Sequence, residues 1–392
     1  MESRTWWWIG GGAVVLALIL FFAFTGDDDD DDGTTTTVPI AADTTTTAEA
    51  EGTTTTAEAT EATTTTEAPP AVEAITACQV TDTGGIDDKS FNQTAWKGVT
   101  DSIDAGLATA DSDFLESQSA TDYQPNIQAF LDKGCDLIIT VGFLLGADTE
   151  TMANANPDQP FQIIDFAYEP GVADSVQGAV FGTTDAAFLA GYLAAGVTET
   201  GIVATYGGIQ IPCGVTCFMD GFVYGVRFYN EVNGTDVQAL GWNPEDQTGV
   251  FTGDFEDLAK GRAVTQSFVD EGADVILPVA GPVGEGSAAL ALELGDVWVI
   301  GVDADWFETL PQFESQILTS VLKGLDVAVS TAIREVAEGT FEGGTRLFAI
   351  AEDGVGLGAI NDDVPQSLQD EVAGILEDLK DGSIVPADQA LS

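Results

Sequence analysis

Beyond its N-terminal part, the chain alternates short apolar runs with amphipathic stretches, and this alternation constrains the fold more than any other feature. The runs ITACQVT (75–81), DLIITV (136–141) and GIVATY (201–206) are typical of buried strands. Between such runs, stretches such as 91–105 place apolar residues at helical spacing. Strands that alternate with helices predict parallel sheets joined by right-handed crossovers.

Two such sets of strands and helices lie on either side of roughly residue 185. The folded part, about 320 residues, also exceeds the usual size of one hydrophobic core. The sequence therefore predicts an α/β protein with two doubly wound parallel-sheet lobes. We expect the first lobe to span approximately 74–185 with a later crossover segment near 303–320, and the second approximately 186–302 with the C-terminal helix region.

In sheets of this kind, ligands bind outside the carboxyl ends of the strands. The segments that follow the expected strands are rich in Gly, Asp and aromatic residues, and would form a cleft for a polar, flat or hydroxylated molecule. They are 82–91, 142–148, 165–168, 207–218, 279–286 and 303–306.

Residues 1–26 are expected to form a membrane anchor or signal segment. The nearly continuous apolar run Trp6–Phe24 is long enough to cross a hydrocarbon layer of ~30 Å. Arg4 precedes it and 27–32 are aspartates, which puts the N-terminus in the cytoplasm and the remainder outside. We expect a protein of the cell membrane with its binding domain on the extracellular side. A cleaved signal peptide remains the alternative, although no clear A-x-A site follows the run.

Residues 27–73 form a low-complexity segment that repeats TTTT among Ala, Glu and Pro. This composition cannot bury enough apolar area to offset chain entropy. It predicts a disordered, solvated tether, which is either O-glycosylated or a plain spacer.

The charge balance excludes several classes of function. With 65 acidic and 11 basic residues the formal net charge is −54, whereas nucleic-acid binding needs Lys and Arg. A salty habitat and a generally acidic proteome both explain this charge. The chain has no histidine, which removes the usual general base and most zinc sites. We therefore expect no catalytic residue, no metal and no cofactor.

The segment TDTGGIDDKSFNQTAWKG (81–98) closely resembles the signature of the basic membrane protein family of binding proteins, which includes purine nucleoside receptors of ABC transporters. Further blocks agree in the same order, and the resemblance covers essentially residue 74 to the C-terminus. These blocks are SQSATDYQPNIQAFLDKGCDLIITVGFLLGAD (117–148), FGTTDAAFLAGYLAA (181–195), GDFEDLAKGRA (253–263), GADVILPVAGPVGEG (272–286), GVDADW (301–306) and TSVLKGLDVAV (319–329).

The resemblance implies a type I periplasmic-binding-protein fold, in which two lobes joined by a multi-crossover hinge close on the ligand. In nucleoside-binding members Asp82 and Asp148 would contact the base, with Asn92 as a secondary contact, and Phe91 would stack on it. A second aromatic from the other lobe would complete the sandwich: Phe255, with Phe251 and Phe218 as alternatives.

The resemblance also implies that Gly281, Asp303 and Lys323 hold the ribose. A carboxylate accepts two hydroxyl protons at once, which suits a vicinal diol. A lysine beside Asp303 would offset the cost of burying that charge.

Each of these residues also fits a simpler structural role. Phe91 fits a core position at the start of its helix, Asp82 an N-cap or turn, and Asp303 a turn after a strand. Lys323 fits a plain surface pairing, and the candidate phenylalanines of the second lobe fit core or lid packing.

One segment departs from the family pattern. The family usually has a Pro followed by apolar and basic residues where this chain reads IQIPCGVTCFMDGF (209–222). The sequence GPVGEG (281–286) also differs from the usual Thr-containing version. Because the first of these segments borders the expected cleft, the departure concerns the identity of the ligand.

Four cysteines in an exported chain predict two disulfides. Cys78 and Cys135 lie on strands that are neighbours in a 2-1-3 order, and Cys213 and Cys217 are close in sequence, so we expect the pairs Cys78–Cys135 and Cys213–Cys217. Buried free thiols are the alternative. A metal site is not expected from C-x-x-x-C without further ligands.

The leading functional hypothesis is the binding component of an ABC uptake system, a monomer whose partners are a small-molecule ligand, with a nucleoside favoured, and a membrane permease. A membrane-tethered sensor with the same fold is the first alternative. A carboxylate hydrolase is less favoured, because acidic neighbours such as Asp87 and Asp88 point apart along the chain.

Overall fold

The computed structural model describes residues 72–387. The expected anchor (1–26) and nearly all of the expected linker (27–73) lie outside the described residues. Within 72–387, no helix has the length and apolar content that a membrane span requires.

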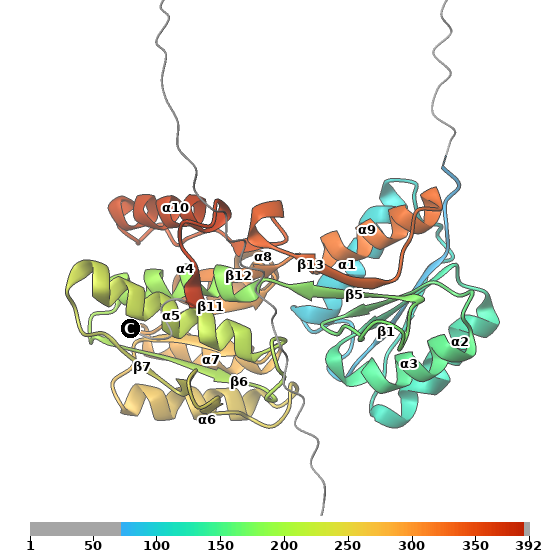
Figure 1. The fold of residues 1–392 in the computed structure, drawn as a ribbon. Helices are drawn as coiled ribbons and strands as arrows, with labels where there is room; N and C mark the ends of the chain where they lie inside the picture. The colour runs from blue at the N-terminus through green and yellow to red at the C-terminus, as the bar shows by residue number, and fades with distance from the viewer. Residues whose placement is uncertain (1–71, 388–392) are drawn as a thin grey trace, which may run out of the picture. The chain divides into compact units, whose positions relative to one another are not determined.

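The first lobe is built on a six-stranded sheet with the order β13-β5-β4-β3-β1-β2, in which every neighbouring pair is parallel. Its strands are β1 (Ala77–Thr81), β2 (Asp113–Leu115), β3 (Leu137–Val141), β4 (Phe161–Ile164), β5 (Val176–Phe181) and β13 (Gly344–Phe348). The central strands are buried, as expected for a parallel sheet covered on both faces. The covering helices are α1 (Phe91–Asp104) and α9 (Leu325–Glu338) on one face, and α2 (Tyr123–Lys133) and α3 (Gly146–Ala155) on the other (Figure 1).

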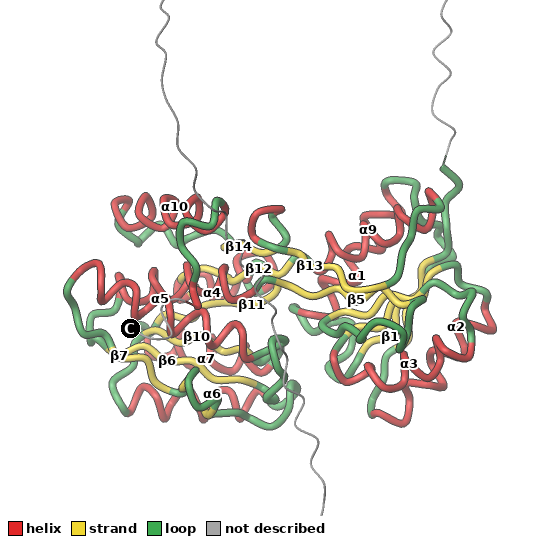
Figure 2. Tube along the Cα trace, viewed as in Figure 1, coloured by secondary structure: helices red, strands yellow, loops and turns green. Residues whose placement is uncertain are grey.

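The second lobe has a six-stranded sheet with the order β14-β12-β11-β10-β6-β7, parallel except for the β12–β14 pair. Its strands are β6 (Ile202–Gly207), β7 (Gln238–Leu240), β10 (Val275–Val279), β11 (Trp298–Asp303), β12 (Ile317–Lys323) and β14 (Val355–Leu357). Its helices are α4 (Thr183–Val197), α5 (Thr216–Asn233), α6 (Leu258–Asp270), α7 (Val283–Leu294), the short α8 (Trp306–Thr309) and α10 (Gln366–Lys380). Figure 2 shows the strands of both sheets in yellow with helices around them, together with the loops that join them.

The chain passes between the lobes after β5, after β12 and again after β13. The predicted fold class, an α/β protein with two parallel-sheet lobes, is confirmed. The crossover segment differs from expectation: residues 303–320 stay in the second lobe, because β12 pairs in parallel with β11. The return to the first lobe is instead made by α9 and β13. The sequence could not distinguish these arrangements, because an apolar run does not reveal which sheet it joins.

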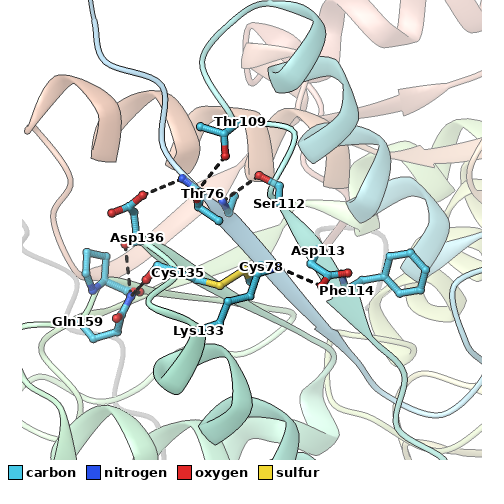
Figure 3. The surroundings of a disulfide bond; sticks show 12 residues. Thr76, Cys78, Thr109, Ser112, Asp113, Phe114, Lys133, Cys135, Asp136 and Gln159 are labelled. Carbon is cyan, nitrogen blue, oxygen red and sulfur yellow. Dashed lines mark hydrogen bonds and ion pairs between the residues drawn. A yellow bond between two sulfur atoms is a disulfide. The ribbon is translucent and has the colours of Figure 1, made fainter.

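Both expected disulfides are present. The Cα atoms of Cys78 and Cys135 are 6.1 Å apart, and those of Cys213 and Cys217 are 4.4 Å apart. Figure 3 shows Cys78 on β1 beside Cys135, which precedes β3; β1 pairs with both β2 and β3. Nearby, the backbone amide of Thr76 donates to Asp136 (2.7 Å). This disulfide is buried and lies toward the amino ends of the strands.

The position of α5 is set by close backbone contact with α4. A Cβ atom on Gly225 or Gly221 of α5 would collide with carbonyl oxygens of α4, and one on Gly191 of α4 would collide with a carbonyl of α5. Glycine at these positions therefore lets the two backbones approach. This contact matters for the candidate site because α5 carries Phe218 in its first turn.

Gly225→Ala is expected to destabilise the protein by ~2 kcal/mol, because overpacking outweighs the gain in helix propensity. Gly374→Ala is the matched control, since it is also a helical glycine but has open space around it. The control should be stabilising by about 0.5–1 kcal/mol. Urea unfolding of both variants tests this, and equal effects at the two positions would contradict the close-contact explanation.

Candidate ligand-binding site

A cavity lies at the carboxyl ends of the strands of both sheets, where the sequence predicted a cleft. It holds about 600 Å³ of empty space, counted to its open mouth. Six of the seven principal predicted site residues line it: Asp82, Phe91, Phe255, Gly281, Asp303 and Lys323. Of the secondary candidates, Asn92 and Phe218 also line it.

Two candidates lie outside the cavity lining. Asp148 is in the first turn of α3, where its carboxylate accepts a hydrogen bond from Gln124 (2.6 Å). Phe251 packs edge-on against Trp242, with ring centroids 5.9 Å apart, and its backbone bridges to Gly207. Phe251 is thus a packing residue of the second lobe.

Lys323 ends β12 and is only 2% exposed, so a surface pairing is excluded. Its ammonium group forms an ion pair with the carboxylate of Asp165. It also lies 5.1 Å from the ring centroid of Phe91 and 5.5 Å from that of Phe218. A carboxylate and aromatic faces together stabilise a cation that has lost its water.

Asp165 is a site residue that the sequence candidates did not include. It follows β4 directly and has a φ of 63°, which is uncommon for a residue other than glycine. Burial raises its pKa and the neighbouring charge of Asp303 raises it further, whereas Lys323 lowers it. Its place at the start of segment 165–168 was the available signal, since that segment follows a strand.

Asp303, at the end of β11, also has a positive φ of 67°. Its carboxylate accepts a hydrogen bond from the hydroxyl of Ser90 in the first lobe (2.8 Å). Burial raises its pKa, while Lys323 and the bond from Ser90 lower it. Two pairs of side chains therefore join the lobes across the cavity: Ser90 with Asp303, and Asp165 with Lys323.

A second hydrogen-bond network fixes the side chain of Asn92 at the start of α1. Asp88, which sequence reasoning also missed, accepts from the backbone amides of Ser90 (3.0 Å), Asn92 (2.7 Å) and Gln93 (3.0 Å), and so caps the helix. The side-chain nitrogen Nδ2 of Asn92 donates hydrogen bonds to the carboxylates of Asp88 (3.2 Å) and Asp82 (3.0 Å). Asp88 therefore orients Asn92 toward Asp82. Burial raises the pKa of Asp88 to about 6 despite these bonds.

Asp82 follows β1 and packs against the backbone of Gly142. A Cβ atom on Gly142 would collide with its carboxylate, and the φ of 115° at that position also requires glycine. Burial raises the pKa of Asp82 to about 8, and the charges of Asp88 and Asp165 add to this, while Asn92 opposes it. At neutral pH Asp82 is therefore largely protonated, and can both donate and accept a hydrogen bond.

Asp82→Asn is expected to raise the melting temperature of the unliganded protein, and more at pH 9 than at pH 5. The pKa of Asp82 rises from 3.8 to about 8 on folding, so the folded state holds the proton more tightly. The stability contributed by this proton is complete below pH 3.8 and is lost as pH rises toward 8. The uncharged amide avoids this loss.

The control is Asp87→Asn, because Asp87 is an exposed neighbour in the same loop. Thermal melts of both variants at the two pH values give the comparison. An Asp82→Asn shift that is the same at pH 5 and pH 9 would contradict the burial argument.

Comparison with known proteins gives the family. Residues 75–386 match the Bmp family, described as ABC transporter substrate-binding protein PnrA-like. The chain belongs to this family. The resemblance predicted from the sequence is thus confirmed, and the protein is a substrate-binding protein of ABC transport systems, not an enzyme.

Two curated relatives illustrate the similarity. The chain is 32% identical to the ABC transporter nucleoside-binding protein BmpA of Lactococcus lactis, over 79% of this chain and 88% of that protein. It is 31% identical to the CD4+ T-cell-stimulating antigen of Listeria monocytogenes, over 79% of this chain and 87% of that protein.

Among solved structures, an ABC transporter solute-binding protein of Aeropyrum pernix aligns with a TM-score of 0.68 at 27% identity, over 79% of this chain and 92% of that one. The regulator CcpA of Lactococcus lactis aligns with a TM-score of 0.50 at 15% identity, over 73% of this chain and 98% of that one, and indicates the fold alone. These likenesses identify the type I periplasmic-binding-protein fold.

Proposed function

We propose that the protein is the extracytoplasmic solute-binding component of an ABC uptake system, that it acts as a monomer, and that its ligand is a purine nucleoside or a related small polar molecule. The observation that carries the proposal is that aromatic rings and a carboxylate–lysine group line the same buried cavity. An aromatic base and a vicinal diol are the two ligand features that such groups bind.

The base would lie between Phe91 of the first lobe and Phe255 of the second. Phe255 is held over the backbone of Gly208, where a Cβ atom would collide with its ring. Stacking of this kind contributes about 0.5–1.5 kcal/mol per ring beyond area burial. Asp82, oriented by Asn92, would read the polar edge of the base by donating or accepting a hydrogen bond.

The sugar hydroxyls would bind at Asp303 and Lys323. Asp303 accepts a hydrogen bond from Ser90 and Lys323 donates one to Asp165, so ligand hydroxyls would compete with contacts that the chain makes itself. Gly281 has a φ of 52° and open space where a side chain would stand, which leaves its backbone accessible. A ligand that contacts residues of both lobes would thus take the place of part of these contacts and itself bridge the lobes, and the closed form is what a permease would recognise.

A thermal-shift screen in high salt tests the ligand class. Adenosine, guanosine or inosine should raise the melting temperature, since a ligand at one hundred times its Kd stabilises a protein by about 2.7 kcal/mol. Sugars and amino acids serve as the comparison classes. No shift with any of the three nucleosides, together with a shift from another class, would overturn the assignment.

Phe91→Leu is expected to weaken nucleoside binding about tenfold, because it keeps apolar bulk but removes the stacking ring. Phe251→Leu is the matched control, because Phe251 is an aromatic of the second lobe outside the cavity lining. Isothermal titration calorimetry should give an unchanged Kd for the control. Equal affinities of both variants would place the base away from Phe91.

A further inference from the structure

The disulfide Cys213–Cys217 lies beside the cavity, in the segment where the chain departs from its family. It joins the loop after β6 to the first turn of α5. Cys213 is exposed, in contrast to Cys78 and Cys135, which are buried in the first lobe at 0% and 2% exposure. The two disulfides therefore occupy different surroundings. Cys78–Cys135 is part of the core of the first lobe, whereas Cys213–Cys217 is not part of that core.

The loop closed by this disulfide forms part of the cavity wall. Ile211, Gly214 and Val215 all line the cavity, and so does Phe218, the residue after Cys217. A Cβ atom on Gly214 would stand 3.6 Å from the Asp165 carboxylate oxygen that binds Lys323. This wall therefore covers the ion pair that joins the lobes.

Hydrogen bonds within the loop do little to fasten it to the sheet. The backbone amides of Ile211, Gly214 and Val215 donate to Ile209, Pro212 and Ile211, all within the same segment. The amide of Cys213 donates to the hydroxyl of Thr216, and Cys213 has a φ of 56°. A residue other than glycine is strained in this conformation and must be held there by its surroundings.

We propose that the Cys213–Cys217 disulfide is a positioning element of the ligand site: it holds the wall formed by Ile211, Gly214 and Val215 against Asp165 and Lys323. The covalent link removes alternative conformations of the loop before the ligand arrives. Binding then does not have to order the loop, and pre-ordering of this kind increases affinity. This inference rests on the proposed function only in taking the cavity as the ligand site.

The test uses the full-length protein and the double variant Cys213→Ser/Cys217→Ser. Amide hydrogen exchange is measured without ligand over 209–217 and, as an internal control, over 77–81, where Cys78 keeps its disulfide. We expect at least about tenfold faster exchange in the first segment and no change in the second. Unchanged exchange over 209–217 would overturn the proposal.

The second measurement is the Kd for guanosine by calorimetry. We expect the double variant to bind about tenfold more weakly, with the melting temperature of the unliganded protein nearly unchanged. Faster exchange with the same Kd would overturn the role in binding. If none of adenosine, guanosine and inosine binds the wild-type protein, the proposed nucleoside function fails, whereas hydrogen exchange still decides whether the disulfide orders the wall.

Discussion

The buried ion pair between Lys323 and Asp165 is the interaction on which the site depends. Lys323 is the one basic residue among those that line the cavity, and it faces a set of carboxyl groups: Asp82, Asp88, Asp165 and Asp303. Buried charges are costly unless each is paired. Because Lys323 ends a strand of the second lobe and Asp165 follows a strand of the first, the contact that pairs the charge of Lys323 also joins the lobes.

The remaining carboxyl groups are accommodated by different means. Asp88 accepts hydrogen bonds from backbone amides at the start of α1 and so caps that helix. Asp303 accepts a hydrogen bond from Ser90. Burial keeps Asp82 largely protonated near neutral pH, although the hydrogen bond that Asn92 donates to it opposes this. The cavity thus combines a neutral acid, a paired lysine and aromatic rings, which is a suitable lining for a polar, uncharged, planar solute.

Residue type drew attention to a candidate residue where that type is rare in the chain, and did not where it is common. Lys323 stood out because the chain has 11 basic residues, whereas Asp88 and Asp165 did not, because it has 65 acidic ones. Asp148 and Phe251 lie outside the cavity lining for another reason, since the direction of a side chain depends on how its helix or loop packs. Position at the carboxyl end of a strand was the more reliable guide.

The sequence by itself determined the two-lobed α/β architecture and most of the cavity lining, because strand–helix alternation is a local property. It also determined the partners of both disulfides, from closeness along the chain for Cys213 and Cys217 and from the strand order expected of such a sheet for Cys78 and Cys135. Only the tertiary structure decided which lobe takes 303–320, and that Ser90 meets Asp303 and Lys323 meets Asp165. Each of these contacts joins residues more than 150 positions apart, Lys323 and Asp165 being separated by 158. Their proximity is fixed by how the two sheets pack, which no local pattern encodes.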